Sequence, residues 1–287
     1  MSHTSEVASA VLEALRLPQR GRIYELASGW WPGMPGIELH PRFDVITYRS
    51  PQGVRVQNDI PMLAPENNSA GMSFISELVM GTTHTGSHID ALCHITCSDE
   101  WHGGHAASEH LGDKGALNSD ATELEPIVAR GVCFDIPGAL GLDVLPPSYP
   151  IGREELERAV ERQGSEIGTG DVALIRTGQM KSWPDVAEME RMSGGAGLSI
   201  DGAKWLHERG VRAVAGDTAF LEVAPSGIEG NPQPVHLFLI QGEGVPILEW
   251  INCEALAADA VYEFLFICLP LTISGATGSM VRPIAIA

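Results

Sequence analysis

Short apolar segments bounded by glycine, proline or aspartate constrain the fold of this chain more than any other feature. Such segments are typical of β-strands, and the 32 glycines and 19 prolines supply turns between them. This pattern argues against a helical bundle. The segments predicted as strands are Gly21–Ala27, Arg42–Tyr48, Ser73–Met80, Val132–Ile136, Asp171–Arg176, Val211–Ala215 and Phe264–Thr272.

Helical patterns are fewer and lie mainly in the second half of the chain. Arg153–Gln163 carries apolar residues at helical spacing, and Ser199–Arg209 begins at a serine cap and stops before Gly210. Asn252–Ala260 is a third candidate helix. Because strands outnumber helices, we expect an α/β or α+β fold around a mixed, largely antiparallel sheet.

The chain shows no break in composition that would divide it, so we expect a single domain over residues 1–287. Residues 1–20 are expected to form a peripheral N-terminal helix on that domain. The helical pattern covers Met1–Leu17 and places four apolar residues on one side. These residues are Val7, Val11, Leu12 and Leu15.

The charge balance excludes some partners. With 18 basic and 37 acidic residues, the net charge of −19 repels phosphate backbones, so we expect no nucleic-acid partner.

The longest apolar run, Phe264–Ile273, is too short for a membrane helix and contains Pro270; it is predicted to be a core strand. The N-terminus lacks a signal-peptide pattern, and the five cysteines form no C-x-x-C pair, so we expect a cytoplasmic protein without disulfides.

Four ionisable groups lie within eleven residues of one another in the segment His84-Thr-Gly-Ser-His88-Ile-Asp90-Ala-Leu-Cys-His94. In an extended segment, residues separated by even steps share a face. His84, His88 and Asp90 would then project together, with Gly86 leaving space between the imidazoles; on a helix, Asp90 would point away. Two imidazoles and a carboxylate are a common ligand set for Zn²⁺ or Mn²⁺, and His94 is placed to move a proton.

A polar surface loop is the alternative interpretation of this segment. The neighbours of these groups are small and apolar, however, and buried imidazoles without a partner would be costly, which favours the metal site. Other histidines are assigned mainly to ordinary structural or exposed roles. They are His3, His40, His102, His105, His110 and His207.

The segment resembles the H-x-G-T-H-x-D-x-P-x-H signature of the cyclase family of metal hydrolases, which includes bacterial kynurenine formamidase and isatin hydrolase. Later segments resemble further parts of the family in the family's order. These are Ile23-Tyr-Glu-Leu26 with Met34-Pro35, Gly170–Gly178, Gly216-Asp217-Thr218, and His236 with Ile247-Leu-Glu249. The resemblance implies a swivelling β/β/α domain that assembles into homodimers or homotetramers.

The resemblance also implies roles for particular residues. His84, His88 and Asp90 bind a first metal ion, and in two-metal members Asp90 bridges to a second ion held by His236 and Glu249. His94 acts as base or acid, and the cofactor is one or two ions of Zn²⁺ or Mn²⁺.

The sequence departs from the family pattern at three points. Ser87 replaces the usual threonine and keeps its hydroxyl, whereas Leu92 replaces the usual proline before His94. Glu249 is followed by Trp-Ile rather than Asn-Leu, so its identification depends on the surrounding apolar frame Val245–Ile251.

Four other residues each have two interpretations. Trp30 and Trp31 line a substrate pocket or a subunit contact, or they pack ordinarily. Trp101 follows the metal motif and forms a pocket rim or part of a plain loop. Asp217 is a partner for a metal-bound imidazole or a turn aspartate.

The function predicted from these residues is hydrolysis of a C–N amide bond in a small molecule. The substrate would be an N-formyl arylamine or a cyclic amide or imide, attacked by metal-activated water with His94 as proton carrier. A lactonase or other esterase would use the same site, and the family name keeps open the reverse, ring-closing direction. A non-catalytic metal-binding or scaffold protein is the alternative from a different class.

Overall fold

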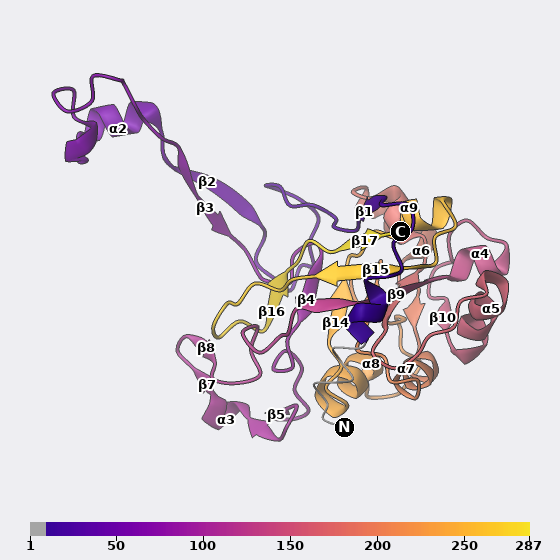
Figure 1. The fold of residues 1–287 in the computed structure, drawn as a ribbon. Coiled ribbons are helices and arrows are strands. Elements are labelled where there is room, and N and C mark those ends of the chain that lie inside the picture. Colours follow the sequence, from indigo (N-terminus) through magenta and orange to yellow (C-terminus); the bar gives the residue numbers. More distant parts are fainter. Residues whose placement is uncertain (1–9) are drawn as a thin grey trace.

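A curled sheet of nine strands forms the centre of the computed structural model, which describes residues 10–287 (Figure 1). The strands in order across the sheet are β1 (Ile23–Glu25), β17 (Ile284–Ile286), β15 (Glu263–Cys268), β9 (Ile127–Asp135), β11 (Val172–Arg176), β13 (Ala213–Gly216), β14 (Ile247–Glu249), β4 (His88–Asp90) and β16 (Gly278–Met280).

The centre of this sheet is parallel and its two sides are antiparallel. β9, β11, β13 and β14 run parallel to one another, whereas the other five neighbouring pairs are antiparallel. Parallel neighbours need long crossovers, and these contain most of the helices. The expected mixed, largely antiparallel α+β fold is therefore confirmed.

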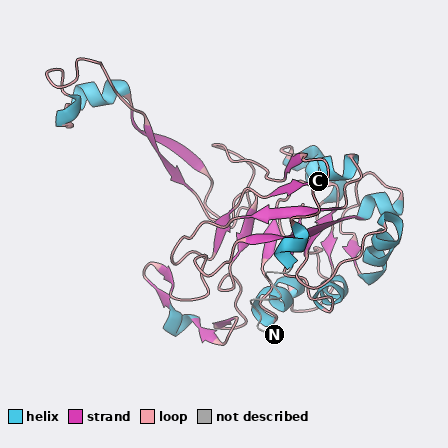
Figure 2. Cartoon of the chain, viewed as in Figure 1, coloured by secondary structure: helices cyan, strands magenta, loops and turns pink. Residues whose placement is uncertain are grey.

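Most of the helices gather around the part of the body that lies away from β2 and β3 (Figure 2). The helices of the described chain are α2 (Pro51–Gln57), α3 (Ala107–His110), α4 (Ile136–Leu140), α5 (Arg153–Gln163), α6 (Val186–Ser193), α7 (Ile200–His207), α8 (Pro234–His236) and α9 (Glu254–Ala258), with 3₁₀ turns at Pro61–Leu63 and Gln179–Ser182 and a π-helical turn at Leu237–Gly242. Of these, α2 lies beyond β2 and β3 and α3 lies beside β5, β7 and β8 (Figure 1).

Each face of the sheet has its own core, because successive side chains of a strand point to opposite faces. Val132 and Phe134 pack under α5, α7 and the π-helical turn, whereas Leu248 and Ile89 belong to the other core with Phe264. Since β4 and β14 pair Leu248 with Ile89 and Glu249 with His88, the latter pair faces the helical side.

Every segment predicted as a strand overlaps an observed strand, but the bounds differ. The segment predicted over Phe264–Thr272 ends at Cys268, two residues before Pro270, which has no N–H for a sheet. α5 spans Arg153–Gln163 as predicted. The predicted helices over Ser199–Arg209 and Asn252–Ala260 are present in shorter form as α7 and α9.

Two of the predicted strands leave the main sheet. β2 (Asp44–Arg49) and β3 (Ser76–Met80) pair only with each other, and they carry α2 at the tip of a long projection that we call the arm, residues 44–80 (Figure 1). Shorter pairs complete the strands: β5 (Glu100–Trp101) with β6 (His105–Ala106), β7 (Leu111–Gly112) with β8 (Gly115–Ala116), and β10 (Pro150–Ile151) with β12 (Gly197–Leu198).

The expected N-terminal helix lies only partly within the described residues. Residues 10–14 are helical, and Val7 lies outside the described range. Leu12 and Leu15 are exposed whereas Ala14 is buried, so the described part does not bury the apolar side that the sequence predicted. Within residues 10–287, no helix is long and apolar enough to cross a membrane. All five cysteines are free, and only Cys97 is exposed.

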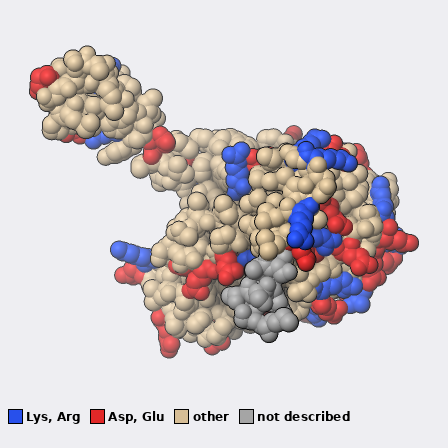
Figure 3. Space-filling view, viewed as in Figure 1, with Lys and Arg blue, Asp and Glu red and all other residues tan. Residues whose placement is uncertain are grey.

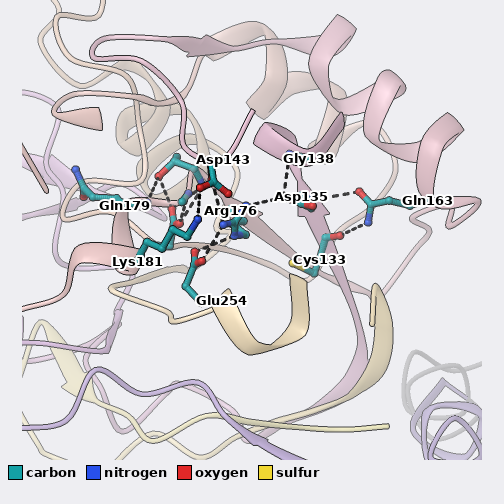
Figure 4. A network of polar contacts seen from close by, with 12 residues as sticks. Cys133, Asp135, Gly138, Asp143, Gln163, Arg176, Gln179, Lys181 and Glu254 are labelled. Atoms are coloured by element: carbon teal, nitrogen blue, oxygen red, sulfur yellow. Dashed lines mark hydrogen bonds and ion pairs between the residues drawn. The ribbon is translucent and has the colours of Figure 1, made fainter. Parts of the chain in front are cut away.

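A buried ionic network at the carboxyl ends of β9 and β11 fixes the segment that follows Glu249 (Figure 4). The Arg176 guanidinium donates to Asp135 Oδ1 at 2.7 Å and, through two nitrogens, to both Glu254 oxygens at 2.8 Å. Asp135 also caps α4 by accepting the Gly138 N–H. Arg176 therefore ties β9 and α4 to α9, which begins at Glu254.

Removing the cation from this network should be costly, because it leaves two carboxylates without their partner. Arg176→Ala is expected to lower the free energy of unfolding by about 3–5 kcal/mol in urea denaturation. The control is Arg153→Ala, which breaks a solvent-exposed pair with Glu208 and should cost at most about 1 kcal/mol. Equal losses in the two variants would contradict a structural role for the network.

Candidate metal centre

Strand β4 and its two neighbours bring three of the predicted ligands to one face. His88 lies opposite Glu249 of β14, and Asp90 lies opposite Gly278 of β16, while Ile89 between them points into the other core. The side chains of His88, Asp90 and Glu249 are all buried. The prediction that His88 and Asp90 share a face is thus confirmed.

His84 reaches the site through a turn, and the prediction of one extended segment from His84 to Asp90 is wrong. The strand begins only at His88. Gly86 has φ +59°, and a Cβ there would lie 2.8 Å from Ser28 Oγ and 3.0 Å from Trp30 Nε1. Glycine at this position therefore permits a left-handed turn and close packing, and it does not leave space for an ion.

Hydrogen bonds orient both imidazoles of the motif. His88 Nδ1 lies 2.8 Å from the Gly86 carbonyl and donates to it, which leaves Nε2 facing Asp90 Oδ1 at 3.5 Å and Glu249 Oε2 at 3.4 Å. His84 has Nε2 2.8 Å from Thr277 Oγ1 and Nδ1 2.9 Å from Asp90 Oδ1. One nitrogen of each ring is thus held by the protein, and the other faces the shared carboxylate.

The fifth predicted ligand comes from a distant helix. His236 ends α8, which begins at Pro234, and its Nε2 lies 3.3 Å from Glu249 Oε1. The five residues form two groups whose ligand atoms lie within 4.8 Å of one another. The first group is His84, His88 and Asp90, and the second is Asp90, His236 and Glu249. Asp90 belongs to both groups, as the bridging position requires.

The electrostatics of these residues fit a divalent cation. Burial would lower the pKa of His236, but the nearby carboxylates of Glu222 and Glu249 outweigh burial and raise the pKa to about 10. The pKa of His88 is raised in the same way, since Glu249 and Asp90 outweigh burial. Glu249 Oε1 is buried and makes no hydrogen bond, although His236 is near. The buried carboxylates of Asp90 and Glu249 therefore need positive charge nearby, which a metal ion would supply.

His94 lies against the first ligand group. Its ring stacks on that of His84 with centroids 3.9 Å apart. Burial lowers the pKa of His94 to about 4, so the imidazole is neutral at pH 7. Leu92, which stands where the family has proline, packs against the core on the helical side of the sheet. The structure thus places His94 beside the ligands, and its role in proton transfer stays a prediction.

His40 also lies at the site, although the sequence analysis assigned it to an ordinary role. Its ring stacks on His84 at a centroid distance of 5.3 Å, and burial together with His84 lowers its pKa. With Thr85 and the loop 33–43, His40 lines a cavity of about 600 Å³. This cavity therefore opens beside His84.

None of the three predicted pocket tryptophans is among the residues that line this cavity. The Trp30 indole donates to the Thr85 carbonyl at 2.8 Å, and Trp31 packs edge-on against Trp183. Trp101 is buried and donates to Asn118 Oδ1. Their roles in substrate binding stay predictions.

Asp217 does not orient an imidazole, which corrects one of its two interpretations. Its buried carboxylate accepts hydrogen bonds from Thr177 N, Thr177 Oγ1 and Gly178 N, and so fixes the loop after β11. Burial raises its pKa to about 6. Asp217 is thus the turn aspartate of the second interpretation.

The carboxylate that does orient an imidazole is Glu222, which the sequence analysis missed. It is buried, accepts the backbone N–H groups of Val235 and His236 at 3.0 and 3.1 Å, and contacts His236 Nδ1. This contact leaves His236 Nε2 for Glu249. Glu222 lies in the loop after β13 and His236 lies at the end of α8, so the two residues meet only in the folded chain.

The mixed sheet, with buried histidines and carboxylates at the edge of its parallel centre, defines an α+β protein with a candidate metal site. The chain belongs to the cyclase family: the family described as "Putative cyclase" matches residues 25–223. A crystal structure of a novel cyclase is 26% identical, with a TM-score of 0.81, over 97% of this chain and 93% of that one.

Two similar structures are hydrolases by name. Isatin hydrolase A from Labrenzia aggregata, bound to benzyl benzoate, is 19% identical over 99% of this chain and 98% of its own, with a TM-score of 0.66. A predicted metal-dependent hydrolase from Bacillus stearothermophilus is 17% identical over 92% and 97%, with a TM-score of 0.56. At these identities they show a shared fold. No curated protein matches the sequence.

Glu222 should affect metal binding through His236. Glu222→Gln keeps the size of the side chain and removes its charge, so the affinity for Zn²⁺ or Mn²⁺ should fall by about 10–100-fold in calorimetric titration of chelator-treated protein. Glu229→Gln makes the same charge change at an exposed position and should leave the affinity unchanged. An unchanged affinity in Glu222→Gln would contradict the orienting contact.

Proposed function

We propose that this protein is a metal-dependent hydrolase that cleaves a C–N amide bond of a small molecule, either an N-formyl arylamine or a cyclic amide or imide. The observation that carries the proposal is the pair of ligand groups sharing Asp90, with His94 stacked on one ligand. Membership of the cyclase family and the likeness in fold to isatin hydrolase support it.

The residues that would hold metal are the two groups described above. His84, His88 and Asp90 offer two imidazoles and a carboxylate, a set that suits Zn²⁺, while the added carboxylate of Glu249 with His236 favours Mn²⁺ for a two-ion site. When bound, such an ion supplies Lewis-acid activation of water and of a carbonyl group.

The protein's own contribution to the reaction is orientation and proton transfer. Gly86 and Thr277 hold the two motif imidazoles in fixed orientations, and Glu222 does so for His236. His94 is neutral at pH 7, so it can accept a proton from the attacking water and pass it to the leaving nitrogen. A nitrogen leaving group needs this proton more than an alkoxide does.

The setting and partners follow the expectations from the sequence. We propose a small-molecule substrate, a homodimeric or homotetrameric assembly, no nucleic-acid partner and a cytoplasmic location. The net charge of −19 and the odd number of free cysteines support the last two points.

A substrate panel tests the proposed reaction against its alternatives. Metal-loaded protein is assayed on a formanilide, on isatin and on a lactone, with chelator-treated protein as control. Amide cleavage that disappears with chelator and returns with Mn²⁺ or Zn²⁺ is expected. Turnover of the lactone alone would favour an esterase, and no metal-dependent turnover would favour a scaffold protein.

His88 should be indispensable because its Nε2 faces the carboxylates of both Asp90 and Glu249. His88→Ala is expected to abolish bound metal, measured by elemental analysis, and turnover with it, while far-UV circular dichroism stays unchanged. His207→Ala removes an imidazole that faces Glu243 at the surface and serves as the matched control. Full metal content and turnover in His88→Ala would remove His88 from the site.

His94 should act in proton transfer rather than in metal binding, because it lies outside both ligand groups. His94→Ala is expected to keep its metal and to lose turnover by about 10²–10⁴-fold, the usual contribution of a positioned acid or base. One limb of the pH–rate profile should change as well. Loss of metal would make His94 a ligand, and near-normal turnover would make it structural.

A further inference from the structure

The imidazole of His40 differs from those of the two ligand groups in having no hydrogen-bond partner within residues 10–287. The three imidazoles of the ligand groups each have one ring nitrogen held by the protein. In His40 the backbone N–H donates to the Ile37 carbonyl at 3.0 Å, whereas only burial and nearby charges act on the ring. A neutral imidazole has one nitrogen that donates and one that accepts. Both nitrogens of His40 are therefore available to a bound molecule.

The ring of His40 lies between the first metal ligand and the cavity of about 600 Å³ that the loop 33–43 lines. It stacks on His84 with the ring planes at 19° to each other, and His94 stacks on His84 as well. Among the described residues no ring contact joins His40 to His94, so His84 separates the two. His40 is half-buried and is the one imidazole in the lining of the cavity. A molecule in the cavity therefore reaches the metal centre past His40.

The lining of the cavity suits a small, largely apolar molecule. Its volume falls within the roughly 300–1,000 Å³ of ordinary small-molecule sites. Met34 and Phe43 are buried in its wall, and Met34 packs on the turn at Gly86. Of the three ionisable residues in the lining, Glu38 and Arg42 are exposed, whereas His40 is not. The polar group nearest the metal centre on this side is thus a partly buried imidazole.

A second hollow of similar volume does not face the metal centre. This apolar groove of about 540 Å³ lies at the root of the arm, and its lining includes Trp30, Phe43, Leu269, Leu271 and Ile284. No imidazole or carboxylate belongs to the described residues that line it. The groove offers no group that could act on an amide, so the cavity beside His40 is the better substrate chamber.

The charge of the molecule favours an uncharged substrate. Figure 3 shows acidic side chains over much of the body, and the net charge is −19. The field of such a surface repels anions. An N-formyl arylamine, a cyclic amide and an imide are all uncharged. They also share one group that a lactone lacks, an N–H donor on the nitrogen of the bond to be cleaved.

We propose that the cavity lined by the loop 33–43 is the substrate chamber, and that His40 accepts a hydrogen bond there from the N–H of the substrate amide. This inference rests on the proposed function and names the residue that selects its amide form over its ester form. A site built to pair with a substrate N–H discriminates against an analogue that lacks it, because the acceptor is then left unpaired. His40 is thus a specificity-determining residue.

The test compares variants on two substrates that differ only in the N–H, formanilide and N-methylformanilide. His40→Phe keeps a ring that can stack on His84 and removes the acceptor, whereas His40→Gln keeps an acceptor oxygen. The matched control, His207→Phe, makes the same replacement where the imidazole faces Glu243 at the surface. The ratio of variant to wild type is taken for each substrate, so that the intrinsic reactivity of the substrate cancels.

In His40→Phe, kcat/KM for formanilide should fall by about 10-fold or more, mainly through KM, because the lost contact is made before the reaction as well as during it. For N-methylformanilide the change should stay within about 2-fold, and His40→Gln should recover part of the loss. Metal content, measured by elemental analysis, should match the wild type. Equal losses on both substrates, unchanged kinetics, or loss of metal in His40→Phe would overturn the inference.

A binding measurement separates this inference from the proposed reaction. Calorimetry with oxindole, a cyclic amide, and with N-methyloxindole measures recognition of the N–H without turnover. The metal-loaded wild type should bind oxindole about 10-fold more tightly, and the difference should disappear in His40→Phe. A wild type that cleaves no amide would contradict the proposed reaction alone. Failure to bind oxindole at millimolar concentration, or a preference for oxindole that persists in His40→Phe, would overturn the role of His40.

Discussion

Burying the Asp90 carboxylate imposes the strictest demand on this structure, because an ionised group removed from water needs several favourable partners. Burial would raise the pKa of Asp90, but His94, His84 and His88 outweigh it and lower the pKa. A different element of local structure positions each of the imidazoles around Asp90. His88 is set by the strand that carries Asp90, and His84 by the left-handed turn at Gly86.

The second ligand group, Asp90 with His236 and Glu249, is brought together by the order of the strands in the sheet rather than by the local motif. β14 is the last strand of the parallel centre, and β4 is the first of the antiparallel side. Helical crossovers cover the earlier parallel strands, but after β14 the chain makes no further parallel crossover. Glu249 and His88 therefore lie at the edge of the helical layer, where α8 brings His236 over them. The change of strand direction places the site.

The local sequence was sufficient to predict the features that depend on neighbouring residues alone. Four ionisable groups in eleven residues predicted His84, His88 and Asp90 as ligands, and helical spacing predicted α5 to the residue. The turn at Gly86 was missed, because even spacing suits a strand equally well. Ser50 followed by Pro51 is a local signal for the start of α2, since a serine cap precedes proline at the first helical position.

Tertiary contacts decided what the sequence could not. Glu222 and His40 meet their imidazoles only through folding, and nothing beside either residue in the sequence indicates this. Strands of three residues, such as β14 and β17, are too short to show alternation. The sequence predicted strands over Arg42–Tyr48 and Ser73–Met80, but it did not indicate that β2 and β3 would pair only with each other, outside the main sheet.

Trp30 connects the apolar groove at the root of the arm to the metal centre. Its ring lines the groove at the root of the arm, while its indole N–H donates to the Thr85 carbonyl, next to His84. The same turn is packed so tightly on Trp30 that Gly86 has no room for a Cβ. Trp30 therefore links the packing of this groove to the segment that carries His84, the first ligand of the metal motif.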